Sequence, residues 1–137
     1  MAATYSIEHL VQFCETDMAG IVHFSNYFRM MEEVEHHFFR SLSLSVSMHY
    51  EAMEISWPRI FASCEYAGPL KFEDVVELVL RVTKVGNKSL TYEVDFINKG
   101  KNIGLGKLTS VCCTMKEGKF QAIEIPAGIR AKLLGKA

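Results

Sequence analysis

One acidic side chain, Asp17, lies in a short segment between an apolar stretch with strand character and a long stretch with helical periodicity. Gly20 follows it, and Ser25 or Asn26 is suited to cap the helix that comes next. Backbone N–H groups without intrahelical partners and the positive end of the helix dipole gather at a helix N-terminus. A carboxylate that can act as a base therefore precedes amides that can stabilise an oxyanion, and acyl-transfer catalysis needs both.

Each residue of this segment also has a purely structural interpretation. Asp is favoured in turns and at helix N-caps, so Asp17 could serve only the turn. Gly20 could be an ordinary loop glycine, and the side chain of Phe24 could belong to the core. His23 and Tyr27 could be structural residues, or they could line a substrate pocket. The spacing alone leaves these alternatives open.

The elements that must position this segment follow from hydrophobic periodicity. Residues 5–14 are predicted to form a strand, and residues 25–42 carry apolar side chains at spacings of three and four, which predicts a long amphipathic helix. The Glu and His residues between positions 32 and 37 are expected to form a solvated face of this helix. A short helical piece is expected over residues 48–53.

The second half of the chain has strand character. Turn sequences separate its apolar stretches and favour antiparallel pairing, and the predicted strands cover residues 59–66, 74–85, 88–98, 103–115 and 120–125. Gly104 and Gly106 indicate a bulge or a close approach of the backbone. Residues 127–134 are expected to make a final helical turn. One long helix followed by antiparallel strands predicts an α+β domain with its sheet curled around the helix.

Composition limits the classes of function. A chain of 137 residues fits one domain, taken here as residues 1–137, that needs no disulfide or metal to fold. The net charge of −1 does not favour binding to nucleic acid or to an anionic membrane surface. No apolar run reaches the roughly 18 residues of a membrane span, and no signal peptide is evident. The four cysteines are expected to be reduced thiols of a cytoplasmic protein.

The pattern F-x-x-T-D-x-x-G-I-V-x-F-x-x-Y, which begins at Phe13, resembles the signature of hotdog-fold acyl-CoA thioesterases. The 4-hydroxybenzoyl-CoA thioesterase type is the branch it resembles most, and the AIEIP sequence at 122–126 resembles the last strand of that branch. The resemblance implies a five- to six-stranded antiparallel sheet wrapped around one long helix. It also implies a homodimer with active sites at the subunit interface, often doubled to a homotetramer, and an acyl-CoA substrate.

The resemblance assigns roles to the residues of the motif. Asp17 is implied as general base or nucleophile, Gly20 permits the tight turn, and the backbone N–H of Phe24 holds the thioester carbonyl. No cofactor or metal is expected beyond coenzyme A as part of the substrate. The substrate-binding candidates are His23, Tyr27, Ser63, Lys84 and Lys88, with the two lysines as candidates for the phosphates of coenzyme A.

The chain departs from related branches at three positions. Thioesterases associated with the Tol–Pal system usually carry Tyr four residues before the Asp and His seven residues after it, where this chain has Phe13 and Phe24. A mechanism that uses those polar side chains is therefore closed to it. Another hotdog branch uses a helix Glu as its acid; Glu33 could take that role, but Asp17 already fills it. His23 stands where family members usually carry an aromatic residue.

We therefore expect an acyl-CoA thioesterase that acts on an aromatic or short-to-medium-chain acyl group. An acyl-carrier-protein thioesterase on the same scaffold is the alternative enzyme. A hotdog dehydratase is less favoured, because it needs a His paired with an acid and only His23 lies near Asp17 in the motif. A non-catalytic acyl-CoA-binding module would bind the substrate without turnover. The sequence does not specify the acyl group, the carrier, the role of Asp17 as nucleophile or base, or the tetramer arrangement.

Overall fold

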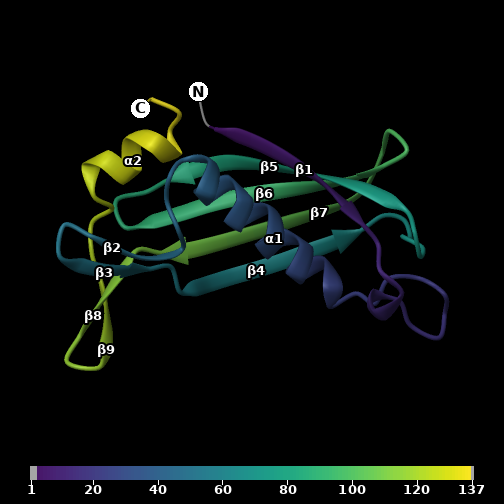
Figure 1. The fold of residues 1–137 in the computed structure, drawn as a ribbon, viewed down its shortest axis with the longest axis horizontal. Helices are drawn as coiled ribbons and strands as arrows, with labels where there is room; N and C mark the ends of the chain where they lie inside the picture. The colour runs from purple at the N-terminus through teal and green to yellow at the C-terminus, as the bar shows by residue number, and fades with distance from the viewer. Residues whose placement is uncertain (1–2, 137) are drawn as a thin grey trace.

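A five-stranded antiparallel sheet packs against one long helix in the computed structural model, which describes residues 3–136 (Figure 1). The helix α1 spans Asn26–Ser41, within one residue of the predicted bounds. The strand order is β1-β5-β6-β7-β4, and each neighbouring pair is antiparallel. The predicted α+β class is confirmed. The strands are β1 (Thr4–Leu10), β4 (Arg59–Tyr66), β5 (Val75–Val85), β6 (Ser89–Asn98) and β7 (Lys101–Val111).

A second, four-stranded sheet lies at the other end of the molecule from the loop that precedes α1 (Figure 1). Its order is β2-β3-β8-β9, and helix α2 (Ala127–Leu133) lies close by. The sequence did not predict this sheet as a separate unit, because the predicted strand 103–115 breaks at Cys112 and its two parts join different sheets. The four strands are β2 (Ser47–Tyr50), β3 (Met53–Ser56), β8 (Cys113–Lys116) and β9 (Lys119–Ala122).

The helical piece predicted over residues 48–53 is wrong. These residues form the β2–β3 hairpin, and its turn residues Glu51 and Ala52 have φ of 48° and 68°. Positive φ at both turn residues matches the backbone twist of a two-residue hairpin, although Glu and Ala adopt it rarely. Pairing of Ile55 with Thr114 on β8 extends the hairpin into a sheet. This long-range partner, which local periodicity does not reveal, favours the strand conformation.

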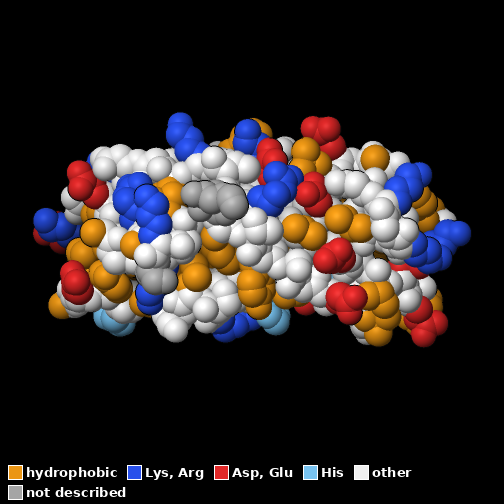
Figure 2. All heavy atoms as spheres, turned by 90° about the horizontal axis from the view of Figure 1, so that it is seen from above, with side chains coloured by type: hydrophobic (Ala, Val, Ile, Leu, Met, Phe, Trp, Pro, Cys, Tyr) orange, Lys and Arg blue, Asp and Glu red, His pale blue; other side chains and the backbone are white. Residues whose placement is uncertain are grey.

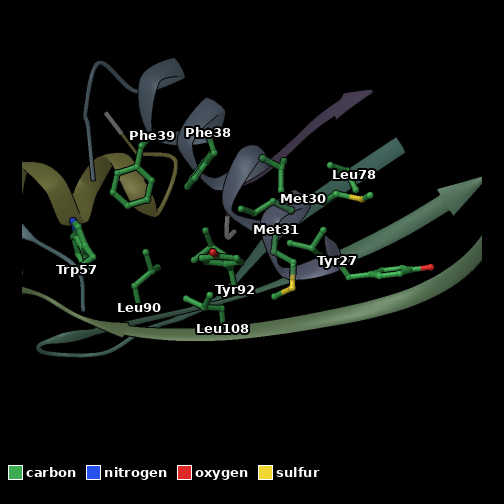
Figure 3. Packing of buried hydrophobic residues seen from close by; sticks show 14 of the residues in the cluster. Tyr27, Met30, Met31, Phe38, Phe39, Trp57, Leu78, Leu90, Tyr92 and Leu108 are labelled. Atoms are coloured by element: carbon green, nitrogen blue, oxygen red, sulfur yellow. The ribbon is translucent and has the colours of Figure 1, made fainter. Parts of the chain in front are cut away.

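The core lies between α1 and the inner face of the five-stranded sheet. Figure 3 shows Met30, Met31 and Phe38 of the helix directed toward the sheet, where Leu78 and Tyr92 are also buried. Burying a side chain of this size contributes about 1.5–3 kcal/mol, so this face holds the helix in place. The predicted close approach at the β7 glycines is confirmed, since a Cβ on Gly106 would come within 2.5 Å of the sulfur of Met31.

One acidic residue of α1 contradicts the expected solvated face. Glu35 is 0 % exposed, and its carboxylate binds the guanidinium of Arg59 through both Nη atoms. Arg59 also donates to the hydroxyl of Ser110 at 3.1 Å. The Tyr92 hydroxyl is buried nearby, and the pKa of this phenol is raised by burial and by the negative charge of Glu35. The ion pair therefore joins the middle of the helix to the start of β4.

Charges on the surface are mixed in sign. Figure 2 shows Lys and Arg side chains interspersed with Asp and Glu over the face seen from above, with hydrophobic side chains between them. All four cysteines are free thiols: Cys14 is exposed, Cys64 is half-buried, and Cys112 and Cys113 are buried. Neither helix within residues 3–136 is long and apolar enough to cross a lipid bilayer.

Candidate active site

The loop between β1 and α1 holds Asp17 next to its base. An isolated antiparallel bridge between Thr16 and Val22 closes the loop at its base. The backbone N–H of Asp17 donates to the carbonyl of Ile21, and its carbonyl accepts from the N–H of Gly20, both at 2.9 Å. Gly20 has a φ of +81°, a left-handed conformation that a residue with a Cβ adopts only with strain. The role of Gly20 in the turn therefore has a physical basis.

The carboxylate of Asp17 is exposed and only partly engaged. Its Oδ1 accepts a hydrogen bond from the N–H of Ala19 at 2.9 Å, as in an Asx turn. Within residues 3–136, Oδ2 has no hydrogen-bond partner. The loop thus orients the side chain through one oxygen and leaves the other available to a substrate or to water.

Of the three backbone amides directly before α1, those of residues 23 and 25 are engaged and the one between them is not. The N–H of His23 donates to the carbonyl of Glu15 at 2.9 Å, and the N–H of Ser25 lies 3.3 Å from Nδ1 of His23. The N–H of Phe24, between them, has no acceptor within residues 3–136. Its carbonyl accepts from the hydroxyl of Tyr66 at 3.0 Å, which fixes the orientation of the residue. A free amide therefore lies at the positive end of α1.

Phe24 also lines a hollow of about 430 Å³. Apart from Asp17, its walls are apolar, aromatic or small: Ile21, Val22, Phe24, Tyr27, Tyr66, Ala67, Gly68 and Pro69. Asp17 also lines a second hollow of about 430 Å³, together with Phe13, Thr16, Met18, Gly20 and Phe72. Asp17 therefore stands at the boundary between two apolar hollows.

The phenol and thiol groups near the first hollow stay protonated at neutral pH. Burial, together with nearby Cys64 and Tyr66, raises the pKa of Tyr27 to about 12. Burial also raises the pKa of Cys64 to about 11 and shifts the pKa of Tyr66 upward. The rings of Tyr27 and Tyr66 meet edge to face with their centroids 4.8 Å apart. No thiolate is therefore available here, and Asp17 is the ionisable residue of the lining suited to act as a base.

The other predicted substrate-binding residues are only partly brought together. Tyr27 lines the first hollow. His23 does not line either hollow, because its Nδ1 lies 2.8 Å from the Ser25 hydroxyl and its ring lies against that of Phe24. This geometry gives His23 no contact with Asp17, which a His–acid pair of the dehydratase type would need.

Ser63, Lys84 and Lys88 lie away from the hollows of the same chain. Ser63 pairs with Lys107 on the outer face of the sheet, since side chains alternate along β4 and its neighbour Cys64 packs against the core. The strand β5 starts beside the loop and Lys84 is near its far end, roughly 30 Å away at 3.3 Å per residue. Lys88 follows the next turn. Their predicted roles stay predictions.

Several residues of the site were missed by the sequence reasoning. Tyr66 and the Gly68-Pro69 turn line the first hollow, although the sequence marked them only as a strand end. His9 and Glu15 form an ion-pair contact beneath the loop with Nε2 to Oε1 at 2.9 Å. The alternation of side chains along β1 was a signal that could have predicted His9 on the inner face of the sheet. No local sequence pattern, however, predicts its contact with Glu15.

Sequence and structure comparisons both match this chain to thioesterases. The profile of the Thioesterase superfamily matches residues 19–104, a segment that starts two residues after Asp17. A protein of Aquifex aeolicus (strain VF5) named "Putative esterase" is 36 % identical over 113 residues, which cover 82 % of this chain and 86 % of that protein. A 1,4-dihydroxy-2-naphthoyl-CoA hydrolase of Prochlorococcus marinus (strain NATL2A) is 25 % identical over 105 residues, with coverage of 72 % and 68 %.

Solved structures give the same picture. A gentisyl-coenzyme A thioesterase superposes with a TM-score of 0.79 at 28 % identity, over 92 % of this chain and 99 % of that one. A protein of Aquifex aeolicus described as hypothetical superposes with a TM-score of 0.80 at 29 % identity, over 94 % of this chain and 98 % of that one. The long sheet and single main helix are thus shared along nearly the whole chain.

Proposed function

The chain belongs to the thioesterase superfamily and is an acyl-CoA thioesterase, and from this premise we propose that Asp17 is its general base or nucleophile. The observation that carries the proposal is the lining of the hollow beside the free amide of Phe24. Apart from Asp17, the lining residues are apolar, or they are tyrosines whose pKa is raised by burial. Asp17 therefore supplies the carboxylate that can act as base or nucleophile. A base and an oxyanion donor thus border one apolar space.

The proposed reaction is hydrolysis of the thioester with water to a carboxylic acid and a thiol. The carbonyl oxygen of the substrate would accept a hydrogen bond from the N–H of Phe24, so the negative charge that develops there is stabilised. Oδ2 of Asp17 would either remove a proton from the attacking water or attack the carbonyl carbon itself. The second route forms an acyl–aspartate anhydride with release of the thiol, and water then hydrolyses the anhydride.

We propose an aromatic acyl group as the substrate class. The rings of Tyr27 and Tyr66 present apolar walls suited to edge-to-face contact with another ring. The names of two relatives, gentisyl-CoA thioesterase and 1,4-dihydroxy-2-naphthoyl-CoA hydrolase, both denote aromatic acyl groups. A short-to-medium aliphatic chain would gain burial in the hollow but would lack the ring contacts.

A panel of acyl-CoA thioesters tests the substrate class directly. Release of free thiol is followed colorimetrically for benzoyl, hydroxybenzoyl, dihydroxynaphthoyl, butyryl, hexanoyl and decanoyl thioesters. The proposal expects the highest kcat/KM for an aromatic member. The same acyl groups on an acyl-carrier protein should react more slowly. Saturable binding without thiol release would instead favour the non-catalytic binding module.

We also propose that two copies pair through β4. This strand ends the sheet order, and within residues 3–136 no strand pairs with its outer edge. Ile60 and Phe61 on β4 are 65 % and 49 % exposed, and an open apolar edge favours pairing with another strand. Two-fold pairing is antiparallel, so it would place the Arg59 end of one copy beside the Tyr66 end of the other.

This pairing would extend the wall of the hollow, because Tyr66 lines it. The proposed assembly is therefore a homodimer with shared active sites, and two such dimers could form a homotetramer. Sedimentation equilibrium should give a mass two or four times the 15.5 kDa of one chain. A mass of one chain at micromolar concentration would contradict the pairing.

A further inference from the structure

We propose that His9, Glu15 and Glu33 form a positioning cluster that holds the catalytic loop in its active geometry. The inference deepens the proposed function and rests on it. The three residues come from three elements: strand β1, the short 3₁₀ turn η1 (Phe13–Glu15) and helix α1. None of them lines either hollow, so they act on the reaction only through the loop.

The geometry of the cluster is tight. Nε2 of His9 lies 2.9 and 3.1 Å from the two carboxylate oxygens of Glu15, and Nδ1 lies 2.7 Å from Oε1 of Glu33. The side chains of His9 and Glu15 are each 14 % exposed, whereas that of Glu33 is 38 % exposed. Screening by water is therefore weaker here than for an ion pair on the open surface.

Each ring nitrogen of His9 lies within 3 Å of a carboxylate oxygen, that of Glu15 on one side and that of Glu33 on the other. The imidazole therefore bridges the two acidic side chains, and Nε2 and the Glu15 carboxylate are within hydrogen-bond distance. Glu15 and Glu33 are the charged groups within ion-pair distance of His9 in the described part of the chain.

Glu15 connects the His9 side chain to both ends of the loop. Its Oε1 accepts the N–H of Gln12 at 2.7 Å, before the loop. Its backbone carbonyl accepts the N–H of His23 at 2.9 Å and the side-chain amide of Asn26 at 2.8 Å, after the loop. When Glu15 is held in place, its carbonyl anchors the residues on both sides of Phe24, through the His23 N–H and the Asn26 side chain. The cluster therefore fixes the backbone segment that carries the free N–H of Phe24.

The cluster should affect turnover more than substrate binding. Part of the first hollow is lined by the loop itself, but Tyr27, Tyr66 and the turn after β4 lie outside the loop and are not polar partners of His9. Misplacement of catalytic groups by about 1 Å can cost as much as 10²-fold in rate. We expect partial loosening of the loop to lower kcat by about tenfold or more, with KM changed by less than about threefold.

The test compares His9→Gln with a matched control. Gln has no ring with nitrogens on opposite edges, so it cannot bridge the two carboxylates as the imidazole does. His49 forms a similar but exposed pair with Glu54 at 3.7 Å on the second sheet, so His49→Gln is the control. For each variant, kcat and KM are measured on the best acyl-CoA substrate. Hydrogen–deuterium exchange of the amides in residues 13–25 is followed without substrate.

The cluster predicts lower kcat and faster exchange at the His23 amide for His9→Gln, and no change of either for His49→Gln. Glu33→Gln, which keeps an acceptor oxygen but loses the charge, should fall between the two. Unchanged kcat and unchanged loop exchange in His9→Gln would overturn the inference. A loss of kcat in His9→Gln without faster exchange of the loop amides would overturn the inference as well. So would a loss of kcat that comes with thermal unfolding of both His9→Gln and His49→Gln below the assay temperature.

The exchange measurement separates this inference from the proposed function. If the wild-type protein hydrolyses no acyl-CoA, the proposed function fails, and the cluster is still judged by exchange in the loop. If the wild-type protein is active and the His9→Gln loop is unaffected, the proposed function stands and the cluster fails.

Discussion

Removal of a single hydrogen atom, the amide hydrogen of Phe24, should abolish most of the activity and leave the fold intact. Replacing Phe24 by its α-hydroxy acid, phenyllactic acid, turns the amide into an ester and keeps the side chain. The N–H of Phe24 has no acceptor in residues 3–136, so the free protein loses no donor bond. The carbonyl of His23 becomes an ester carbonyl and accepts the N–H of Asn26 more weakly. In the complex, the charge that develops on the thioester oxygen would lose its donor.

The expected loss follows from the energetics of oxyanion donors. One such donor is worth about 10²–10³ in kcat, or about 2.7–4 kcal/mol. Because the amide is unpaired before substrate binds and only the acceptor at His23 is weakened, the free energy of unfolding should fall by less than about 1 kcal/mol. For a chain of 137 residues this corresponds to less than about 4 °C in Tm.

The assay is steady-state thiol release with the best acyl-CoA, beside thermal unfolding of the same samples. The same ester replacement at Phe120, an exposed phenylalanine on the distant strand β9, is the control for the chemistry of the modification and should leave kcat unchanged. If the Phe24 ester keeps kcat within about threefold of the native amide, another group must hold the oxyanion and the assignment is refuted.

Three further predictions concern the scaffold of the site. Glu35→Gln should remove the buried carboxylate that binds the partly exposed guanidinium of Arg59 and lower the free energy of unfolding by about 2 kcal/mol, or about 7 °C in Tm by calorimetry. Gly106→Ala should cost about 1–3 kcal/mol in urea unfolding, because the new Cβ would meet the sulfur of Met31; the double variant with Met31→Ala should be less unstable than the two losses summed. The raised pKa of Tyr27, about 12 against an ordinary 10, means that its contribution to stability is complete below pH 10 and is lost as the pH rises toward 12. This difference corresponds to about 3 kcal/mol, so urea unfolding of Tyr27→Phe should depend less on pH between 10 and 12 than that of the wild type, and equal pH dependence would contradict the assignment.

Local patterns predicted the central helix, the main strands and the loop that holds Asp17. The spacing of apolar residues marks the buried face of α1, and its observed bounds differ from the predicted ones by one residue at each end. Gly20 marks the left-handed turn, because glycine adopts a φ of +81° without strain. These features depend on residues close in sequence, which is why the sequence reveals them.

Features that depend on distant residues were not predicted. The β2–β3 hairpin is completed by pairing of Ile55 with Thr114, which lies far along the chain. Glu35 looks like a solvated helix residue until Arg59 is brought against it by the start of β4. His9 and Glu15 meet only when β1 and the loop fold over α1. Charged residues thus gave the poorest predictions, because their burial depends on a partner that periodicity does not identify.

The most direct test of the account is the turnover of Asp17→Asn. The Asn side-chain carbonyl can still accept the N–H of Ala19, so the loop should keep its shape while the carboxylate is lost. Asp74→Asn is the matched control, because this carboxylate also accepts a backbone N–H in a turn, that of Lys71, but lines neither hollow. On the best acyl-CoA, Asp17→Asn is predicted to lower kcat by about 10²–10⁴, with the control near wild type. Turnover by purified Asp17→Asn within about threefold of the wild type would contradict the central claim.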